Sequence, residues 1–475
     1  MFDVAVIGGG VIGGTILREL VKYRFSVCLL EKEGDVCMGQ SRANSGIVHA
    51  GFDAKEGSLK AKFNLLGNKM MKDYAEELGV KYENNGSLVV AFSEEELKTL
   101  EALYRRGLAN GVEGLSIIGQ DELRALEPNI SEEALGALLA KTGGIICPYG
   151  LTIAAIGNAM DNGASLYTDF EVTAISGRAG AFTIESADGE RVESRLVINC
   201  AGLGSGRIAS LVGDEIAVSG RRGEYMLLDR ESGNFVKHTL FFTPTEKGKG
   251  ILVSPTADKN LLLGPTAEPI EDGSTDTTEV GLASVREKAA EMVKDPPLYT
   301  VITSFSGVRA YCDRHDFIIE ESKATEGVVH CAGIESPGLT SAPAIAQYVV
   351  ETLVGAHLPL EENPTFCGKR ERESFFKELS AEEKNALIKK DPAYGRIICR
   401  CEQVSEGEIV RAIRENPPAK NIDAIKRRTR GGMGRCQGGF CQPQVAEILA
   451  RERGIRLDEV TKSGKNSKLL EGVTK

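Results

Sequence analysis

A glycine-rich turn between two apolar segments near the start of the chain constrains the fold more than any other feature. Residues 4–7 are apolar, a G-x-G-x-x-G motif follows at positions 8–13, and apolar residues then recur at helical spacing. A second apolar run over 26–30 ends at Glu31, 18 residues beyond the last glycine of the motif. The order strand, turn, helix, strand and acid predicts a βαβ unit that binds a dinucleotide.

Each residue of the motif has a mechanical reason. Gly8 permits the tight turn, Gly10 lets a pyrophosphate approach the backbone, and Gly13 lets the helix pack closely on the strand. The pyrophosphate would lie against the free N–H groups at the start of the helix. Glu31 would accept hydrogen bonds from ribose hydroxyls, and we place its neighbour Lys32 at the same site.

Two later segments predict a long cofactor. An apolar strand over 197–200 ends in Ala201 and Gly202, and a glycine-rich turn over 331–340 precedes an apolar helix over 342–353. Three nucleotide-contacting segments so far apart in the chain favour FAD and a discontinuous nucleotide domain. Outside the first turn, the expected cofactor contacts are Ser41, Asn44, Ser45, Gly46, Val172, Ala201, Gly202, Gly333, Gly338, Leu339 and Thr340.

Together with the first turn, the segment over 41–51 and the Gly338-Leu339-Thr340 turn resemble the D-amino-acid oxidase superfamily of flavoproteins. Within it, the chain resembles the branch of glycerol-3-phosphate dehydrogenase and L-2-hydroxyglutarate dehydrogenase. The resemblance covers about residues 1–360. It implies an α/β fold with a discontinuous Rossmann-like FAD-binding domain and an inserted, mainly antiparallel β substrate domain. It also implies non-covalent FAD and hydride transfer from a secondary alcohol to the flavin.

The expected domains follow from this resemblance and from the cysteines described below. We expect the FAD-binding domain over 1–85, 145–215 and 305–360, the substrate domain over 86–144 and 216–304, a linker over 361–395 with one amphipathic helix around 381–388, a small helical domain over 396–455, and a flexible tail over 456–475.

Oxidation of an alcohol requires a base for the hydroxyl proton. His49 is the leading candidate because the resemblance places its segment near the flavin ring, although it is also open to a purely structural role. His238 matches a histidine-bearing strand of the hydroxyglutarate branch and is the second candidate. Arg309, in a Gly-Val-Arg motif, offers a planar fork for a phosphate or carboxylate and stays charged at any working pH. Arg221 and Arg222 are weaker candidates for a second contact with the anion.

The sequence leaves the substrate open. The segments over 57–63 and 222–225 resemble the hydroxyglutarate enzymes, whereas Ser254 and the segment over 262–266 resemble the glycerol-3-phosphate group. We expect a small anionic substrate, with sn-glycerol 3-phosphate favoured over L-2-hydroxyglutarate or another 2-hydroxy acid. A subunit of an amine or imino-acid dehydrogenase, and an electron-transfer subunit without an activity of its own, are further alternatives.

Four cysteines near the C-terminus have the spacing of a metal centre. Cys399 and Cys401 are two residues apart, Cys436 and Cys441 are five apart, and glycines surround the second pair. The segment over 396–455 resembles the bacterioferritin-associated ferredoxin-like domain, which implies a [2Fe-2S] cluster on these four thiolates. Zinc is the alternative, because four cysteines also suit tetrahedral Zn²⁺. The other cysteines are expected to be small buried residues: Cys28, Cys37, Cys147, Cys200, Cys312, Cys331 and Cys367.

The charge of the chain is divided unevenly. The net charge of −11 disfavours nucleic acid as a partner. Residues 396–475 contain 17 lysines and arginines against 10 acidic residues, a net charge of +7, so the preceding body carries −18. The basic run over 426–430 is either a docking surface, for the chain's own body or for an acidic partner, or a solvated face. We expect a second redox subunit or electron carrier, a cytoplasmic location, and membrane contact only through a partner.

Overall fold

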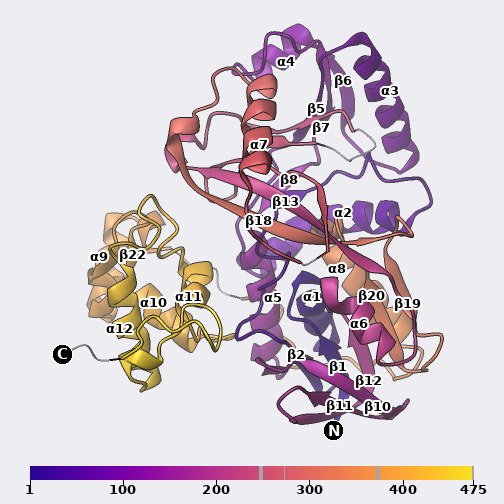
Figure 1. Ribbon diagram of the computed structural model, residues 1–475, viewed down its shortest axis with the longest axis vertical. Coiled ribbons are helices and arrows are strands. Elements are labelled where there is room, and N and C mark those ends of the chain that lie inside the picture. The colour runs from indigo at the N-terminus through magenta and orange to yellow at the C-terminus, as the bar shows by residue number, and fades with distance from the viewer. Residues whose placement is uncertain (245–249, 272, 371–374, 473–475) are drawn as a thin grey trace.

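The computed structural model describes residues 1–244, 250–271, 273–370 and 375–472. Figure 1 shows three parts: a body of helices and strands that contains the N-terminus, a second part built around a long twisted sheet, and a smaller helical part at one side, drawn in yellow. The expected fold class is confirmed.

An eight-stranded sheet forms the core of the first part. The βαβ motif places β1 between β2 and β12, and all three run parallel, as do β2 with β9 and β12 with β20. Helices α1, α5 and α8 pack together beside it. The bounds are β1 (Phe2–Ile7), α1 (Val11–Leu20), β2 (Val27–Leu30), α5 (Pro148–Asp161), β9 (Ser165–Tyr167), β10 (Val172–Arg178), β11 (Ala181–Ser186), β12 (Arg191–Asn199), β19 (Ile318–Glu321), β20 (Val328–Ala332) and α8 (Gly338–Tyr348).

A nine-stranded sheet, antiparallel except where β14 meets β5, forms the second part. Its strands come from the two stretches expected for the substrate domain, but the boundary expected between 304 and 305 falls inside β18. The reason is that β18 pairs with β13 along its whole length. The bounds are β5 (Ser87–Ala91), α3 (Glu94–Ala109), β6 (Leu115–Gly119), α4 (Gln120–Leu126), β7 (Gly136–Ala140), β13 (Val218–Leu228), β14 (Thr239–Phe242), β15 (Leu252–Pro255), β16 (Leu261–Gly264), β17 (Glu268–Ile270), α7 (Glu279–Met292) and β18 (Val301–Cys312).

Short elements join the two large sheets. Strand β3 (Ile47–Val48) pairs with β8 (Gly144–Ile146), which also pairs with β4 (Tyr82–Glu83). Helix α2 (Leu59–Glu77) begins at Ser58, whose hydroxyl accepts the Ala61 N–H. Its Gly67 lies against α8, where an added Cβ would be 2.0 Å from the Thr340 carbonyl oxygen. The two helices therefore pack backbone against backbone.

The C-terminal module has its own apolar core, which includes Ile398, Ile409, Ile425 and Leu449. Helix α10 begins with a capping box between Ser405 and Glu408. The module's elements are β21 (Ile397–Cys399), β22 (Val404–Ser405), α10 (Glu406–Arg414), α11 (Ile422–Thr429) and α12 (Gln442–Arg453). The module is therefore helical, as expected.

The segments on either side of the module contact the rest of the molecule. The amphipathic helix expected around 381–388 is α9 (Ala381–Lys390). After residue 456, Val460 is buried and Thr461 pairs with Lys468. The flexibility of the tail stays a prediction.

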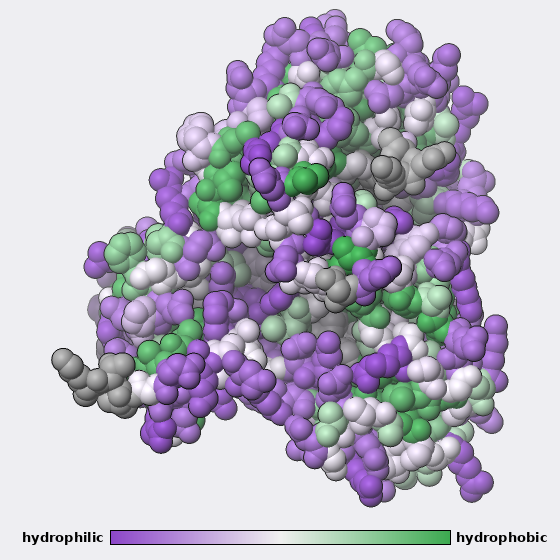
Figure 2. All heavy atoms as spheres, viewed as in Figure 1, coloured by the Kyte–Doolittle hydropathy of each residue, from purple (hydrophilic) through white to green (hydrophobic). Residues whose placement is uncertain are grey.

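Within the described parts of the chain, no helix is both long and apolar enough to cross a membrane. Hydrophilic residues dominate the face in Figure 2, and hydrophobic ones form small, separate patches.

Candidate active site and cysteine centre

Two adjoining cavities lie where the glycine-rich segments meet. One has a volume of about 430 Å³ and is lined by the first turn, Glu31 and the segment around Ala201. The other has a volume of about 420 Å³ and is lined by His49, residues of the inserted sheet and the 334–339 turn. Gln40, Ser41 and Gly307 line both cavities, so a single elongated ligand fits along the two. We refer to them as the nucleotide cavity and the substrate cavity.

The nucleotide cavity has the backbone features of a dinucleotide site. Gly8 has a φ of +110°, and a Cβ added there would lie 2.4 Å from the Cys200 carbonyl oxygen. A Cβ added at Gly13 would lie 2.0 Å from the Gly8 carbonyl oxygen. Only glycine fits either position, which leaves the backbone open to a ligand and lets α1 pack against the turn.

Glu31 lies at the wall of this cavity as expected. Its carboxylate accepts the N–H groups of Gly9, at 2.6 Å, and of Glu33, at 2.9 Å. Burial raises the pKa of this carboxyl group to about 7, although the two N–H groups oppose the shift. A buried acid that makes no ion pair with any described residue is suited to hydrogen-bond the hydroxyls of a ribose.

Most of the expected cofactor residues line one of the two cavities, and four do not. Gly8, Gly10, Glu31, Lys32, Ser41, Val172, Ala201 and Gly202 line the nucleotide cavity, and Asn44, Ser45, Gly338 and Leu339 line the substrate cavity. Gly13, Gly46, Gly333 and Thr340 are not among the lining residues. Thr340 acts indirectly, because its hydroxyl accepts the N–H of His49 at 2.9 Å.

His49 projects from the end of β3 into the substrate cavity. Its Nε2 lies 3.1 Å from the Ser336 hydroxyl, and its carbonyl oxygen accepts a hydrogen bond from the Asn64 amide at 2.8 Å. Its ring lies 6.0 Å from that of Phe241. The backbone of His49 is therefore fixed by α2 and α8, while the imidazole faces the cavity.

Arg221 and Arg309 face the same cavity from neighbouring strands. They lie directly opposite each other in the β13–β18 ladder, which places both side chains on one face of the sheet. The Arg309 guanidinium reaches the Thr266 carbonyl oxygen at 3.4 Å, and that of Arg221 lies 4.3 Å from the ring centre of Tyr311. Among the described residues, neither arginine forms an ion pair. Arg222 differs, because it pairs with the buried Glu224 at 3.4 Å.

The structure does not bring His238 to the cavity. Its Nδ1 lies 2.7 Å from the carboxylate of Glu127, which also accepts the backbone N–H of His238 at 2.6 Å. Glu127 is fully buried at the end of α4. A buried carboxylate requires such partners, so the structure assigns His238 to Glu127. The role of His238 as a base stays a prediction without geometric support.

Three side chains of the cavity were not anticipated. Gln40 bridges the Ile334 carbonyl and the Ala310 N–H, Ser336 contacts His49, and the Tyr225 ring stacks on Phe305 with centroids 4.8 Å apart. Gln40 directly precedes the segment that carried the resemblance, and Tyr225 lies four residues beyond Arg221. The only sequence signal for these residues was their position beside residues already expected at the site.

The four cysteines of the C-terminal module form two pairs. The sulfurs of Cys401 and Cys436 are 3.7 Å apart, and the Cys399 and Cys441 thiols are hydrogen-bonded. Cys399 and Cys441 are buried, whereas Cys401 is exposed. Among the residues that the structure describes, no three His, Cys, Asp or Glu side chains gather closely enough to hold one metal ion. Two pairs of thiols suit a cluster of two irons, each with two thiolates.

Backbone N–H groups surround these sulfurs. The hydrogen bond with Cys441, followed by the N–H groups of Gly432 and Glu402, lowers the pKa of Cys399. The Phe440 N–H lowers that of Cys436. Such donors favour the thiolate that a cluster requires. Of the other seven cysteines, five are buried as expected and Cys147 is partly buried. Cys367 is exposed, against expectation, because it lies in the segment that crosses the surface towards the module.

Comparisons with known proteins agree with both sites. The family of FAD dependent oxidoreductases (DAO) matches residues 3–352, and the BFD-like [2Fe-2S] binding domain matches residues 397–451. A glycerol 3-phosphate dehydrogenase of Caloramator mitchellensis is 48% identical over 100% of this chain and 99% of that protein. An L-2-hydroxyglutarate dehydrogenase of Pongo abelii is 30% identical over 74% of this chain and 87% of that protein.

Among solved structures, the L-alpha-glycerophosphate oxidase of Mycoplasma pneumoniae with FAD bound aligns with a TM-score of 0.74 and 31% identity. The alignment covers 78% of this chain and 98% of that one. The cavities, the paired cysteines and these matches agree on the cofactors. The chain belongs to the family of FAD-dependent oxidoreductases and carries a C-terminal [2Fe-2S]-binding domain.

Proposed function

We propose that this enzyme oxidises sn-glycerol 3-phosphate to dihydroxyacetone phosphate and passes the electrons through the [2Fe-2S] cluster to a partner redox subunit. The observation that carries the proposal is the pair Arg221 and Arg309, which face the substrate cavity together with His49. The similar dehydrogenase and oxidase, both named for glycerol phosphate substrates, support it.

The two guanidinium groups would hold the phosphate. Each presents N–H donors in a planar fork that matches a phosphate oxygen pair, and a charge-assisted hydrogen bond is about twice as strong as a neutral one. The Tyr311 ring lies beside Arg221 and so limits the positions that its guanidinium can adopt. The phosphate would thereby set the orientation of the carbon that carries the reacting hydroxyl.

His49 would accept the hydroxyl proton at Nε2. The contact with Ser336 gives this nitrogen a hydrogen-bond partner before the substrate enters, and the Thr340 hydroxyl holds the backbone of His49 in place. Bound FAD would supply the hydride acceptor. Ser336 would reorient its hydroxyl as the imidazole gains the proton, because a hydroxyl both donates and accepts.

The second candidate is the oxidation of L-2-hydroxyglutarate. An arginine pair binds carboxylates as well as phosphates, and the Pongo abelii relative is named for that substrate. The first experiment is therefore anaerobic. The purified holoprotein is mixed with sn-glycerol 3-phosphate and, separately, with L-2-hydroxyglutarate, and the visible spectrum of the flavin is recorded.

Bleaching of the flavin by glycerol 3-phosphate alone is the expected result. Bleaching by L-2-hydroxyglutarate alone would overturn the proposal in favour of the second candidate, and bleaching by neither compound would overturn it in favour of another substrate, such as an amine. A matched test uses His49→Gln, which we expect to slow flavin reduction by about 10²–10⁴-fold without loss of FAD. Unchanged reduction in this variant would remove His49 from the proposal.

A further inference from the structure

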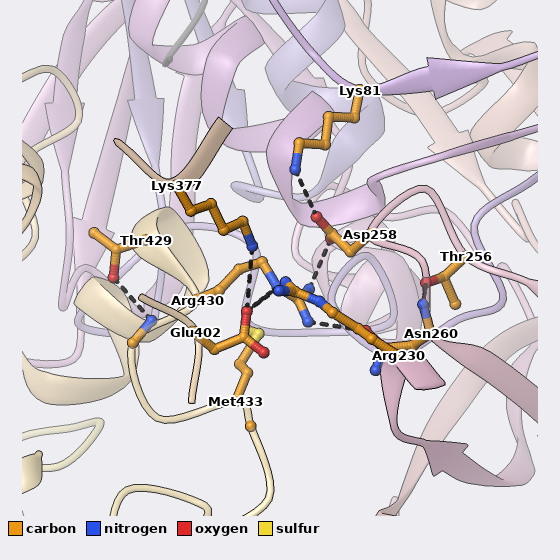
Figure 3. Close-up of polar contacts among 12 residues, drawn as sticks. Lys81, Arg230, Thr256, Asp258, Asn260, Lys377, Glu402, Thr429, Arg430 and Met433 are labelled. Atoms are coloured by element: carbon orange, nitrogen blue, oxygen red, sulfur yellow. Dashed lines mark hydrogen bonds and ion pairs between the residues drawn. The ribbon is translucent and has the colours of Figure 1, made fainter. Parts of the chain in front are cut away.

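A network of buried and partly buried charges joins the cysteine module to the rest of the chain (Figure 3). We call it the Glu402 network. It consists of two acidic residues, Asp258 and Glu402, and four basic ones, Lys81, Arg230, Lys377 and Arg430. Asp258 and Arg230 belong to the part built on the nine-stranded sheet, and Glu402 and Arg430 belong to the module. Lys377 comes from the segment that was expected to be a linker.

Arg430 is the centre of the network. Its guanidinium donates to Glu402 at 3.0 Å, to Asp258 at 2.7 Å and to the amide oxygen of Asn260 at 3.0 Å. Its side chain is only 5% exposed. It also reaches the Tyr149 hydroxyl at 3.0 Å, so one side chain binds both large parts of the body.

Glu402 contacts three of the four cations of the network. Besides Arg430, it pairs with Arg230 and lies 3.5 Å from the ammonium group of Lys377. Its side chain is 3% exposed. The fourth cation, Lys81, lies 3.2 Å from Asp258.

The cations of the Glu402 network outnumber its acids. The described residues provide four cations against two buried carboxylates, and a third, half-exposed carboxylate, Glu378, contacts Lys81 from outside. The balance is therefore positive even when Glu378 is included. In agreement, burial followed by repulsion from Arg230 lowers the pKa of Lys377 to about 8.

The Glu402 network adjoins the cysteines through the backbone. Glu402 follows Cys401 in the chain, and its backbone N–H bonds to the sulfur of Cys399. The Gly432 N–H bonds to the same sulfur two residues after Arg430. The two loops that hold the buried thiol pair are therefore the loops from which Glu402 and Arg430 project.

We propose that the Glu402 network raises the reduction potential of the [2Fe-2S] cluster, with Lys377 and Arg430 as tuning residues that touch neither substrate nor cluster. Reduction adds one electron, and hence one negative charge, to the centre held by the four thiolates. A buried positive charge beside it stabilises the reduced form more than the oxidised form, because little water screens the interaction. A raised potential lets the cluster draw electrons from the flavin side. The inference concerns the cluster and holds for any substrate.

The test measures the midpoint potential of the cluster by a redox titration of the full-length holoprotein, followed by its EPR signal in the reduced state. Lys377→Met removes a buried cation, and we expect the ratio of reduced to oxidised cluster at a fixed potential to fall about tenfold, which equals about 59 mV for one electron. Lys389→Met, at an exposed position of α9, is the matched control and is expected to leave the ratio unchanged.

Glu402→Gln is expected to shift the midpoint potential of the cluster in the opposite direction. It removes a buried negative charge and keeps the backbone N–H on Cys399, so we expect the reduced fraction to rise. A purely structural role would shift both variants in the same direction or neither of them. The proposal is overturned if Lys377→Met titrates like Lys389→Met, or if Lys377→Met and Glu402→Gln shift the midpoint alike. Lys377→Arg, which keeps the charge, is expected to restore the wild-type value.

Discussion

Two carboxylates four residues apart, Glu31 and Asp35, show how the nucleotide cavity differs from the interface of the cysteine module. Both are buried. Glu31 accepts two backbone N–H groups and makes no ion pair with a residue that the structure describes, and burial raises its pKa to about 7. Asp35 pairs with Arg427 and Arg428 of α11, which lower its pKa despite burial.

The comparison distinguishes unpaired charged groups that line a cavity from paired charged groups that stabilise the interface. In the two cavities, Glu31, Arg221 and Arg309 make no ion pair with any described residue. At the module interface, each buried carboxylate is matched by two or more cations. Unpaired buried charge is costly unless a ligand completes it, whereas paired charge resists removal of either partner. Four substitutions test this distinction, from the largest expected effect to the smallest.

Arg309→Ala should have the largest effect. We expect kcat/KM for glycerol 3-phosphate to fall about 10³-fold, equal to about 4 kcal/mol, because a charge partner of the bound anion is lost. FAD content, measured from the flavin absorbance, should not change. Arg314→Ala, which removes an exposed ion pair with Glu320 beyond the end of β18, is the control and should keep full activity. Equal kinetics in the two variants would contradict the assignment.

Asp35→Asn should destabilise the module on the body by about 4 kcal/mol, since it leaves Arg427 and Arg428 buried without a counter-charge. The measurement is native-state hydrogen exchange of the α11 amides in the holoprotein, which reports the free energy of local opening. Substrate kinetics of the flavin half-reaction should change far less. If α11 exchanges as slowly as in the wild type, the interface does not depend on this pair.

Glu31 should make the FAD-free protein less stable as the pH rises. Its folded pKa of about 7 exceeds the ordinary value of 4.5, so the folded state holds the proton more tightly and loses stability between these two pH values. The loss is roughly 3 kcal/mol by pH 7. In Glu31→Gln we expect a flatter dependence of the thermal midpoint over this range, measured on the FAD-free protein. Parallel curves for the two proteins would contradict the raised pKa.

Asp188→Asn should have the smallest effect. Asp188 pairs with Lys465 at 3.0 Å between the body and the C-terminal segment, but both side chains are about two-thirds exposed. Exposed pairs contribute little because water and salt screen them. We expect no measurable change in the exchange of α11, in contrast to Asp35→Asn. A comparable loss in both variants would show that burial does not decide the strength of this interface.

Local patterns predicted much of the fold. The βαβ unit, the helices of the module and the paired cysteines all follow from spacings within about 40 residues, and the structure contains each of them. The boundary inside β18 was missed because the β13–β18 ladder joins residues 73 to 94 positions apart. Such a pairing leaves no mark on the hydrophobic pattern of either strand.

The position of a side chain was predictable where it lines a cavity, and less so where it faces another part of the chain. His49, Arg221 and Arg309 were expected at the substrate cavity and lie there. The attachment of His238 to Glu127 joins residues 111 positions apart. The sequence did not decide whether the basic run over 426–430 is a docking surface or a solvated face. The burial of Arg427, Arg428 and Arg430 against the body supports docking onto the chain's own body, which no charge count could decide.

The contact between Gly67 and Thr340 sets the distance between α2 and α8, and this distance affects the position of the His49 backbone. The missing side chain at Gly67 lets α2 and α8 approach until their backbones touch. A methyl group there would have to push α8 aside, and the Thr340 hydroxyl that holds the His49 backbone would move with it. The absence of a side chain at Gly67 thus sets how closely α2 and α8 approach, and with it the position of the His49 backbone.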